Sequence, residues 1–274
     1  MSARPAVPKG ARTAAEGERL PVAGLQYAAR GLVGLLTPQA NTTVEPEFSI
    51  LLPPGHAHIA ARMVSSAESL DARLVAYIRD AGLTAAQFAN APLTSLAIAC
   101  TGSSYLVGRE EEQRLLAELS RQCRVPAFTS ASAIVECLAR QGARRIALAS
   151  PYPESLTQAS AAYWRSHGLT VVRIVRAETD PTQFHPIYAL RTDAATGMLD
   201  ALGALDDVDA VLLLGTGMPS LAPLLQAHQA RRGTPVLSSM VCLAWKAVDA
   251  AEPGACSLDD WLSGRHWAAR LALA

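Results

Sequence analysis

Short apolar runs alternate along the chain with longer amphipathic segments, and this alternation predicts an α/β fold. Each run has the length of a buried strand and is bounded by glycine, proline or hydroxyl-bearing residues. Most of the segments between them have the length of helices, about 10 to 20 residues, an order typical of parallel sheets with crossover helices. The expected strands are 31–37, 58–64, 93–99, 125–130, 145–150, 169–177, 208–214 and 234–238. The expected helices include 67–90, 108–123, 131–141, 154–167, 187–205 and 219–232.

The order of sequence landmarks repeats once along the chain. Corresponding landmarks lie about 110 to 115 residues apart, which is the signature of an internal structural repeat. The matching pairs are Thr37-Pro38 with Ser150-Pro151, residues 100–102 with 215–217, and 125–130 with 234–239. We therefore predict two similar α/β lobes, each with a parallel four-stranded sheet, related by pseudo-twofold symmetry. The active site is expected in the cleft between them.

The repeat also suggests domain boundaries. We assign residues 31–124 together with 234–274 to the first lobe, and residues 125–233 to the second. Residues 1–30 are rich in alanine, arginine and proline and lack the apolar stretch of a secretory signal. We expect them to form a mobile extension, with a helical arm over 13–30 that packs on a partner subunit as the alternative.

Composition narrows the class of protein. The 274 residues carry 24 basic and 24 acidic side chains, so the balance of charge indicates neither a nucleic-acid partner nor an anionic membrane surface. No apolar run reaches the roughly 18 residues that cross a bilayer. The five cysteines are odd in number and form no C-x-x-C pair. We therefore expect reduced thiols in a cytoplasmic protein, rather than disulfides or a zinc site.

Cys100 stands where the third expected strand ends, followed by Thr101, Gly102 and Ser103. In an open parallel sheet, ligands bind just beyond the carboxyl ends of the strands. Cys100 is therefore a candidate nucleophile or proton carrier. As a nucleophile it would be a thiolate, its pKa lowered by backbone N–H dipoles at the strand end. The alternative is a small buried hydrophobic residue without chemistry.

Three motifs resemble the aspartate/glutamate racemase superfamily and, within it, the maleate cis-trans isomerases and arylmalonate decarboxylases. Residues 37–47 are similar to the maleate isomerase opening, whose Asn41-Thr42-Thr43 equivalent holds a substrate carboxylate. Residues 150–152 resemble the family's strand-end tyrosine, and 214–221 resemble its second cysteine loop. The resemblance spans about residues 31–248. It implies a substrate-binding set of Pro38, Asn41, Thr42, Thr43, Thr101, Gly102, Ser103, Tyr152, Gly215 and Gly217.

The chain departs from these families at the second cysteine. Racemases of the superfamily and maleate isomerases carry one cysteine in each half, whereas arylmalonate decarboxylases keep only the second-half cysteine. Here the first-half position is Cys100, and the second falls on Thr216, or on Gly215 if the alignment shifts by one residue. Catalysis by a Cys/Cys pair is excluded, and a Cys/Thr pair remains possible.

The resemblance implies an isomerase that acts on a small (di)carboxylic acid through Cys100, without a cofactor. No dinucleotide, phosphate-loop or metal-ligand motif contradicts this. Hydroxyl, amide and backbone N–H donors would stabilise the enolate-like species of such a reaction. The alternatives are arylmalonate-type decarboxylation, Cys/Thr racemisation and a non-catalytic carboxylate-binding protein. A small carboxylate is the expected partner, and we expect a homodimer.

Other polar residues are assigned simpler roles. Glu45 and Glu47 are expected to interact with the dipole of the helix that begins after Thr43. His185 lies after the sixth expected strand, and we expect it in a solvent-exposed loop. The remaining cysteines, at positions 123, 137, 242 and 256, are expected to be inert.

Overall fold

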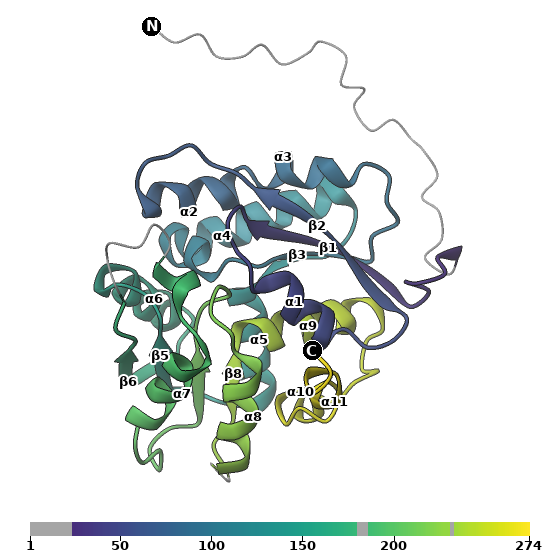
Figure 1. Ribbon diagram of the computed structural model, residues 1–274. Helices are drawn as coiled ribbons and strands as arrows, with labels where there is room; N and C mark the ends of the chain where they lie inside the picture. The colour runs from purple at the N-terminus through teal and green to yellow at the C-terminus, as the bar shows by residue number, and fades with distance from the viewer. Residues whose placement is uncertain (1–23, 180–185, 231–232) are drawn as a thin grey trace, which may run out of the picture.

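Two four-stranded parallel sheets form the framework of the computed structural model, which describes residues 24–179, 186–230 and 233–274 (Figure 1). The first sheet has the order β2-β1-β3-β4, with β1 Gly31–Pro38, β2 His56–Met63, β3 Ser95–Ile98 and β4 Ala127–Thr129. The second has the order β6-β5-β7-β8, with β5 Arg145–Ser150, β6 Thr170–Arg176, β7 Ala210–Leu213 and β8 Val236–Ser238. The matching strand order confirms the predicted α/β class and the internal repeat.

The central strands are buried on both faces, as is usual when helices cover both sides of a parallel sheet. Every residue of β1, β3 and β7 is buried. Pairing aligns Leu36 of β1 with Ile98 of β3, and Ala149 of β5 with Leu213 of β7. Neighbouring strands of each sheet therefore end together, and the loops that follow them lie at one edge.

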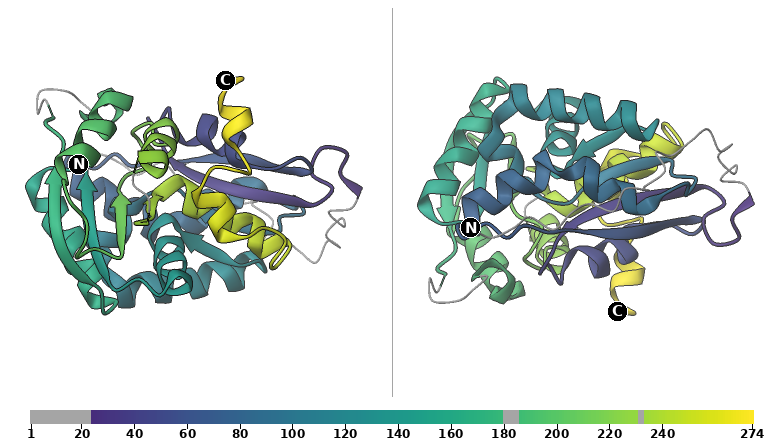
Figure 2. Two further views of the ribbon diagram at one scale, coloured as in Figure 1. Left: turned by 90° about the horizontal axis from the view of Figure 1, so that it is seen from below. Right: turned by 90° about the horizontal axis from the view of Figure 1, so that it is seen from above.

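Helices cover the sheets and also join the lobes. They are α1 Val44–Leu51, α2 Leu70–Arg79, α3 Ala81–Ala85, η2 Ala86–Phe88, α4 Thr101–Cys123, α5 Ser130–Gln141, α6 Glu154–Ser166, η3 Pro186–Ala189, α7 Thr192–Ala201, α8 Leu221–Ala230, α9 Ser239–Ala251, α10 Leu258–Leu262 and α11 Ala268–Leu271. Helix α4 packs on α2 and, across the lobes, on α6, while α9 packs on α5 and β3 (Figure 2). Helix α11 contacts both α1 and α8. The lobes thus share an extensive packed interface.

Strand pairing differs from the predicted domain boundaries at two short strands. β4 falls in the segment 125–233 assigned to the second lobe, yet it pairs with β3 of the first sheet. β8 falls in the segment 234–274 assigned to the first lobe, yet it pairs with β7 of the second. Helix α9, which follows β8, does pack against β1 and β3. The chain therefore crosses between the lobes after each of these strands rather than before it.

Helix α4 begins earlier than its hydrophobic pattern predicts. The helix expected over 108–123 begins at Thr101, directly after Cys100, and a kink at Gly108 separates its first turns from the amphipathic part. Gly108 has φ +75°, which a residue with a side chain rarely adopts. The expected helix 187–205 is likewise divided, into η3 and α7, with extended backbone at Arg191 between them.

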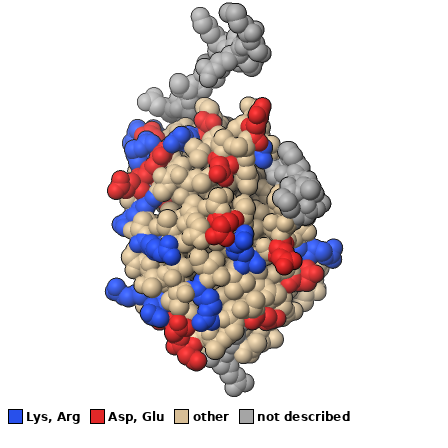
Figure 3. Space-filling model, turned by 90° about the vertical axis from the view of Figure 1, so that its left-hand side faces the viewer, with Lys and Arg blue, Asp and Glu red and all other residues tan. Residues whose placement is uncertain are grey.

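The described residues include no helix suited to crossing a membrane, and their surface mixes both signs of charge. No helix in the described ranges combines the length and apolar character that crossing a bilayer would require. On the face in Figure 3, acidic and basic side chains are interspersed. The predicted extension 1–30 lies mostly outside the described residues, as does His185.

Candidate active site

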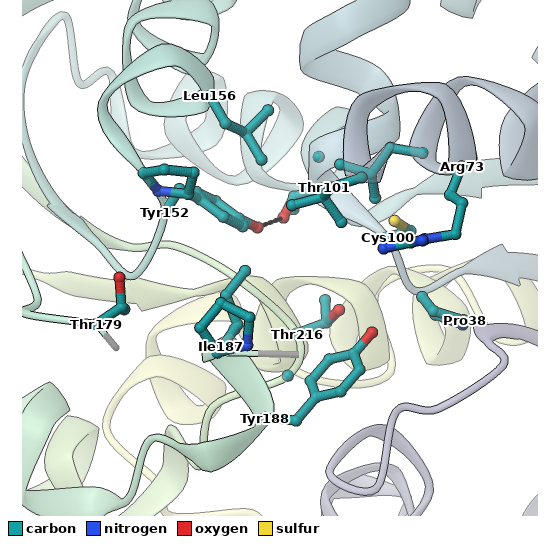
Figure 4. A pocket seen from close by; sticks show the side chains of 16 residues that line it. Pro38, Arg73, Cys100, Thr101, Tyr152, Leu156, Thr179, Ile187, Tyr188 and Thr216 are labelled. Atoms are coloured by element: carbon teal, nitrogen blue, oxygen red, sulfur yellow. Dashed lines mark hydrogen bonds between the residues drawn. The ribbon is translucent and has the colours of Figure 1, made fainter. Parts of the chain in front are cut away.

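The carboxyl ends of both sheets contribute to one cavity of about 310 Å³ (Figure 4). Seven of the predicted site residues line it: Pro38, Cys100, Thr101, Gly102, Tyr152, Thr216 and Gly217. Pro38 ends β1 and the next three follow β3 in the first lobe, and the last three follow β5 and β7 in the second. The internal repeat therefore brings equivalent strand ends from the two lobes to a single site.

Cys100 is the residue that precedes α4, and its side chain lies at the wall of the cavity. It is 4% exposed, and its Sγ lies 3.1 Å from the Ser103 hydroxyl, which is also 2.7 Å from the Leu74 carbonyl oxygen. Burial raises the pKa of the thiol above its usual value, although the Ser103 hydroxyl and the amides of Ser103 and Gly102 act against this. Of the two forms considered for Cys100, the thiolate with a lowered pKa is therefore not favoured here, because desolvation outweighs these donors. The resting group at neutral pH is the thiol.

Thr101 and Tyr152 join the two lobes across the cavity. Their hydroxyl oxygens lie 2.6 Å apart, and either can be the donor. Burial raises the pKa of Tyr152, so its phenol is neutral. Each hydroxyl has one proton, and their mutual hydrogen bond uses one of the two. The pair can therefore present a hydroxyl donor to a ligand oxygen.

Of the two second-half candidates, Thr216 lines the cavity and Gly215 is not among its lining residues. Thr216 lines the cavity, and its hydroxyl donates to the carbonyl oxygen of Ala99 at 2.9 Å. Gly215 makes the turn before it with φ +93°, a conformation that glycine adopts without strain. Because the hydroxyl proton of Thr216 is directed at the backbone, the hydroxyl oxygen can only accept a hydrogen bond from any other group.

The Asn41 loop contacts the second lobe instead of lining the cavity. Asn41 Nδ2 donates to the Thr216 carbonyl oxygen at 3.2 Å, and the Thr43 hydroxyl donates to the Gly217 carbonyl oxygen at 3.0 Å. Asn41 Oδ1 accepts from the backbone N–H groups of Thr43 and Val44, which ties the loop to α1. The loop therefore holds residues 216 and 217 in position without lining the cavity itself.

Three more predicted residues also lie outside the cavity lining. Thr42 is exposed, Ser103 is buried behind Cys100, and Gly215 packs near the ring of Pro151. With Asn41 and Thr43 they make five of the predicted site residues that do not line the cavity. Their motifs mark the strand ends correctly, but adjacent residues in such loops point in different directions.

Glu47 forms a second connection from α1 to the same loop. Its carboxylate accepts from the Ser220 N–H at 2.5 Å, the Leu221 N–H at 3.2 Å and the Ser220 hydroxyl at 2.8 Å. Burial raises the pKa of Glu47 to about 7, against the effect of these donors. The expected role at the dipole of its own helix was incomplete, because the carboxylate caps the beginning of α8. Glu45 instead pairs with Arg62.

Several cavity residues carry no recognisable sequence signal. Arg73 comes from α2, where Nη1 donates to the carbonyl oxygens of Ala67 at 3.2 Å and Glu68 at 2.9 Å. Tyr188 comes from η3, and burial raises the pKa of its phenol. Apolar side chains from α2, α6 and η3 complete the wall, among them Leu74, Leu156 and Ile187. All belong to segments in which only the fold decides which face meets the cavity.

Gly217→Ala is expected to lower kcat/KM about tenfold to a hundredfold, because a methyl group there would displace Tyr188. A Cβ atom at this position would lie 2.4 Å from the Tyr188 ring, far inside contact distance. Steady-state kinetics with the substrate proposed below measures the effect. Gly197→Ala on α7 is the matched control, since a Cβ there meets nothing within 4 Å. Equal kinetics for the two variants would show that Tyr188 does not shape the site.

Comparison with known proteins identifies the family. A profile of the arylmalonate decarboxylase family matches residues 33–259. The chain belongs to this family. It is 27% identical over 252 residues to a maleate isomerase of Pseudomonas putida, covering 85% of this chain and 98% of the relative. It is 30% identical over 227 residues to a maleate isomerase of Nocardia farcinica, covering 78% and 87%.

Solved structures of the family agree in fold. One is a mutant Nocardia farcinica maleate cis-trans isomerase with a covalently bound succinylcysteine intermediate, which superposes with a TM-score of 0.71 at 23% identity. The superposition covers 80% of this chain and 92% of that one. The predicted membership of the racemase superfamily and the two-lobed fold are confirmed. This family member is therefore an enzyme of the isomerase and decarboxylase type.

Proposed function

We propose that the enzyme is a cis-trans isomerase of maleate or a closely related cis-enedioate, with Cys100 as the covalent nucleophile. The position of Cys100 carries the proposal, because it is the one of the five cysteines that lines the cavity. It also stands in the half where maleate isomerases keep their nucleophile. A mutant of the Nocardia farcinica isomerase holds a covalently bound succinylcysteine intermediate, in which a cysteine is joined to a four-carbon diacid.

The proposed reaction needs no co-reactant. The Cys100 sulfur forms a bond to C2 of the cis-enedioate, and the C2=C3 π electrons move into the adjoining C4 carboxylate group. An oxygen of that group takes the thiol proton as it becomes an enediol. The C2–C3 bond is now single and rotates. The electron pair then returns to form the trans double bond, the C–S bond breaks, and the sulfur recovers its proton.

The residues around Cys100 support this sequence of steps. A buried, neutral thiol carries the proton that the enediol oxygen requires. Thr101 and Tyr152 offer a hydroxyl to the oxygens on which charge develops, in a site where burial strengthens such interactions. Thr216, held by the Ala99 carbonyl, is proposed to border the opposite face of the reacting carbons rather than to transfer a proton.

Acid quenching during turnover of maleate tests the covalent step. Peptide mass spectrometry is expected to find one maleic acid added to the peptide that contains Cys100, and NMR is expected to show fumarate. In D₂O the fumarate should carry no deuterium on carbon, because the transferred proton stays on oxygen and sulfur. Deuterated fumarate would contradict the mechanism, and an absence of both adduct and fumarate would contradict the function.

Decarboxylation of a substituted malonate is the second candidate, because a thiol kept protonated by burial is the form that delivers a proton to carbon. The C–C bond to the departing carbon dioxide breaks, its electron pair remains as an enediolate, and Cys100 protonates the carbon. Water then restores the thiol. This reaction places one solvent deuterium on the product carbon, so the same D₂O experiment with an arylmalonate separates the two candidates.

We also propose that the enzyme works in the cytoplasm as a homodimer. Its five cysteines are free, as is usual in a reducing compartment. Large apolar side chains such as Leu83 and Val64 are 76% and 70% exposed in the single chain. Light scattering coupled to size-exclusion chromatography measures the mass directly, and a monomer at micromolar concentration would contradict the dimer.

A further inference from the structure

Arg73 is the one charged side chain among the described residues that line the cavity. The remaining lining residues are neutral, and many are apolar, such as Leu70, Leu74, Leu156 and Ile187. A carboxylate placed against those apolar side chains would lose its water without gaining a partner. A dianionic ligand therefore has one place in this wall where a formal positive charge meets it.

The guanidinium of Arg73 is held in a defined position. Its Nη1 donates to two backbone carbonyls, those of Ala67 and Glu68, in the residues just before α2. A guanidinium is planar and has five N–H donors, so fixing one nitrogen through two acceptors also orients the rest of the plane. Planar donors of this kind match the two oxygens of a carboxylate.

Arg73 lies on the part of α2 that contacts Cys100. The neighbouring residue, Leu74, accepts a hydrogen bond at its carbonyl from the Ser103 hydroxyl, and that hydroxyl is 3.1 Å from the Cys100 sulfur. Figure 4 shows Arg73 and Cys100 on the same side of the cavity, with Thr179 across it. The side chains of Leu74 and Leu156 meet close to Gly102, which has no side chain to occupy that space.

We infer that Arg73 binds the carboxylate attached to the carbon that Cys100 attacks, and that it makes the enzyme selective for dianionic substrates. This inference rests on the proposed function. The second carboxylate, which receives the electrons, then faces Thr101 and Tyr152. Because the carboxylate at Arg73 keeps its charge throughout the reaction, Arg73 stabilises the bound substrate and the transition state equally. Its removal raises KM and leaves kcat nearly unchanged.

The experiment compares maleate with maleamide, in which amides replace both carboxylates at nearly equal size, so that no carboxylate is left for Arg73. Arg73→Gln is expected to raise KM for maleate about a hundredfold and to leave kcat within about threefold. The same variant should change kcat/KM for the uncharged maleamide less than fivefold, so the preference for the dianion largely disappears. Arg73→Lys, which keeps a charge without the planar donors, should recover part of the maleate affinity.

Arg79→Gln is the matched control, because Arg79 lies on the same helix but is exposed and pairs with Glu111. It should leave both substrates unaffected. An unchanged KM for maleate in Arg73→Gln, or an equal loss for maleate and maleamide, would overturn the inference. A folding defect in Arg73→Gln would show as a lowered melting temperature, and Arg73→Lys then carries the test through its preference for maleate over maleamide.

Binding to a protein without its nucleophile separates this inference from the proposed function. In the Cys100→Ser protein, calorimetry with succinate and with the uncharged succinamide measures the preference for a dianion without any turnover. A preference of at least tenfold that disappears in Cys100→Ser combined with Arg73→Gln supports the role of Arg73 even if maleate is not the substrate. Equal affinities in both proteins would overturn it even if maleate is isomerised.

Discussion

Cys100→Ala and Cys100→Ser are expected to fold like the wild type and to lose turnover of maleate by at least about a thousandfold. The sulfur is the only nucleophile of the proposed mechanism, and neither substitution can form and break a bond to C2 at a comparable rate. Both replacements are small enough for the site, where the thiol is 4% exposed at the cavity wall. The measurement is fumarate formation followed by NMR, together with thermal unfolding to confirm the fold.

Cys256→Ser provides the control for general effects of removing a thiol, because Cys256 is half-buried and lies away from the cavity lining. It is expected to keep wild-type kcat and KM. Turnover within tenfold of wild type in Cys100→Ser would contradict covalent catalysis by this residue. It would leave Thr216 and Tyr152 as the groups on which catalysis would have to rest.

Glu47→Ala is expected to lower the free energy of unfolding by about 3 to 5 kcal/mol, the largest loss of stability that we predict for a polar residue. The substitution leaves the N–H groups of Ser220 and Leu221 buried without their acceptor, and the Ser220 hydroxyl keeps only Ser238 Oγ, at 3.2 Å. Urea unfolding at constant pH measures the change. Glu45→Ala on the same helix is the control, since Glu45 is partly exposed and its ion pair with Arg62 contributes about 1 kcal/mol or less.

Glu47 also predicts how stability depends on pH. Its pKa in the folded protein is raised to about 7, above the pKa of about 4.3 expected in the unfolded chain. Between these values the folded state binds more protons, so the contribution of Glu47 is fully present below the unfolded pKa and is lost as the pH rises through 7. Glu47→Gln should flatten the wild-type decline in unfolding free energy between pH 5 and pH 8. Parallel curves for the two proteins would contradict the raised pKa.

The hydrophobic pattern predicts the strands well because most residues of each central strand are apolar and buried. The expected strand 145–150 coincides with β5, and the expected strand 31–37 falls one residue short of β1. The short strands β4 and β8 lie in the right places, but pairing with a sheet is a long-range property that their own residues do not encode. The early start of α4 was missed because Thr101, Gly102 and Ser103 show no helical periodicity.

The site residues likewise fall into those that the sequence predicts and those that only the fold reveals. Cys100, Tyr152 and Thr216 could be predicted because each follows a buried strand, and the ends of parallel strands meet at one edge. Arg73 and Tyr188 could not, since an arginine or tyrosine in a helical segment gives no sign of whether it faces solvent or a cavity. The Asn41 loop was identified as part of the site, but its side chains bind the opposite lobe, which only the relative placement of the lobes reveals.

The hydrogen bonds from Asn41, Thr43 and Glu47 to residues 216–221 have a consequence for protein engineering. A chimera assembled from the halves of two family members would combine α1 of one parent with the loop before α8 of the other parent. In such a hybrid the hydrogen bonds between the two segments would not match, unless both segments come from the same parent. Directed recombination within this family should therefore exchange residues 41–47 and 216–221 as a single unit.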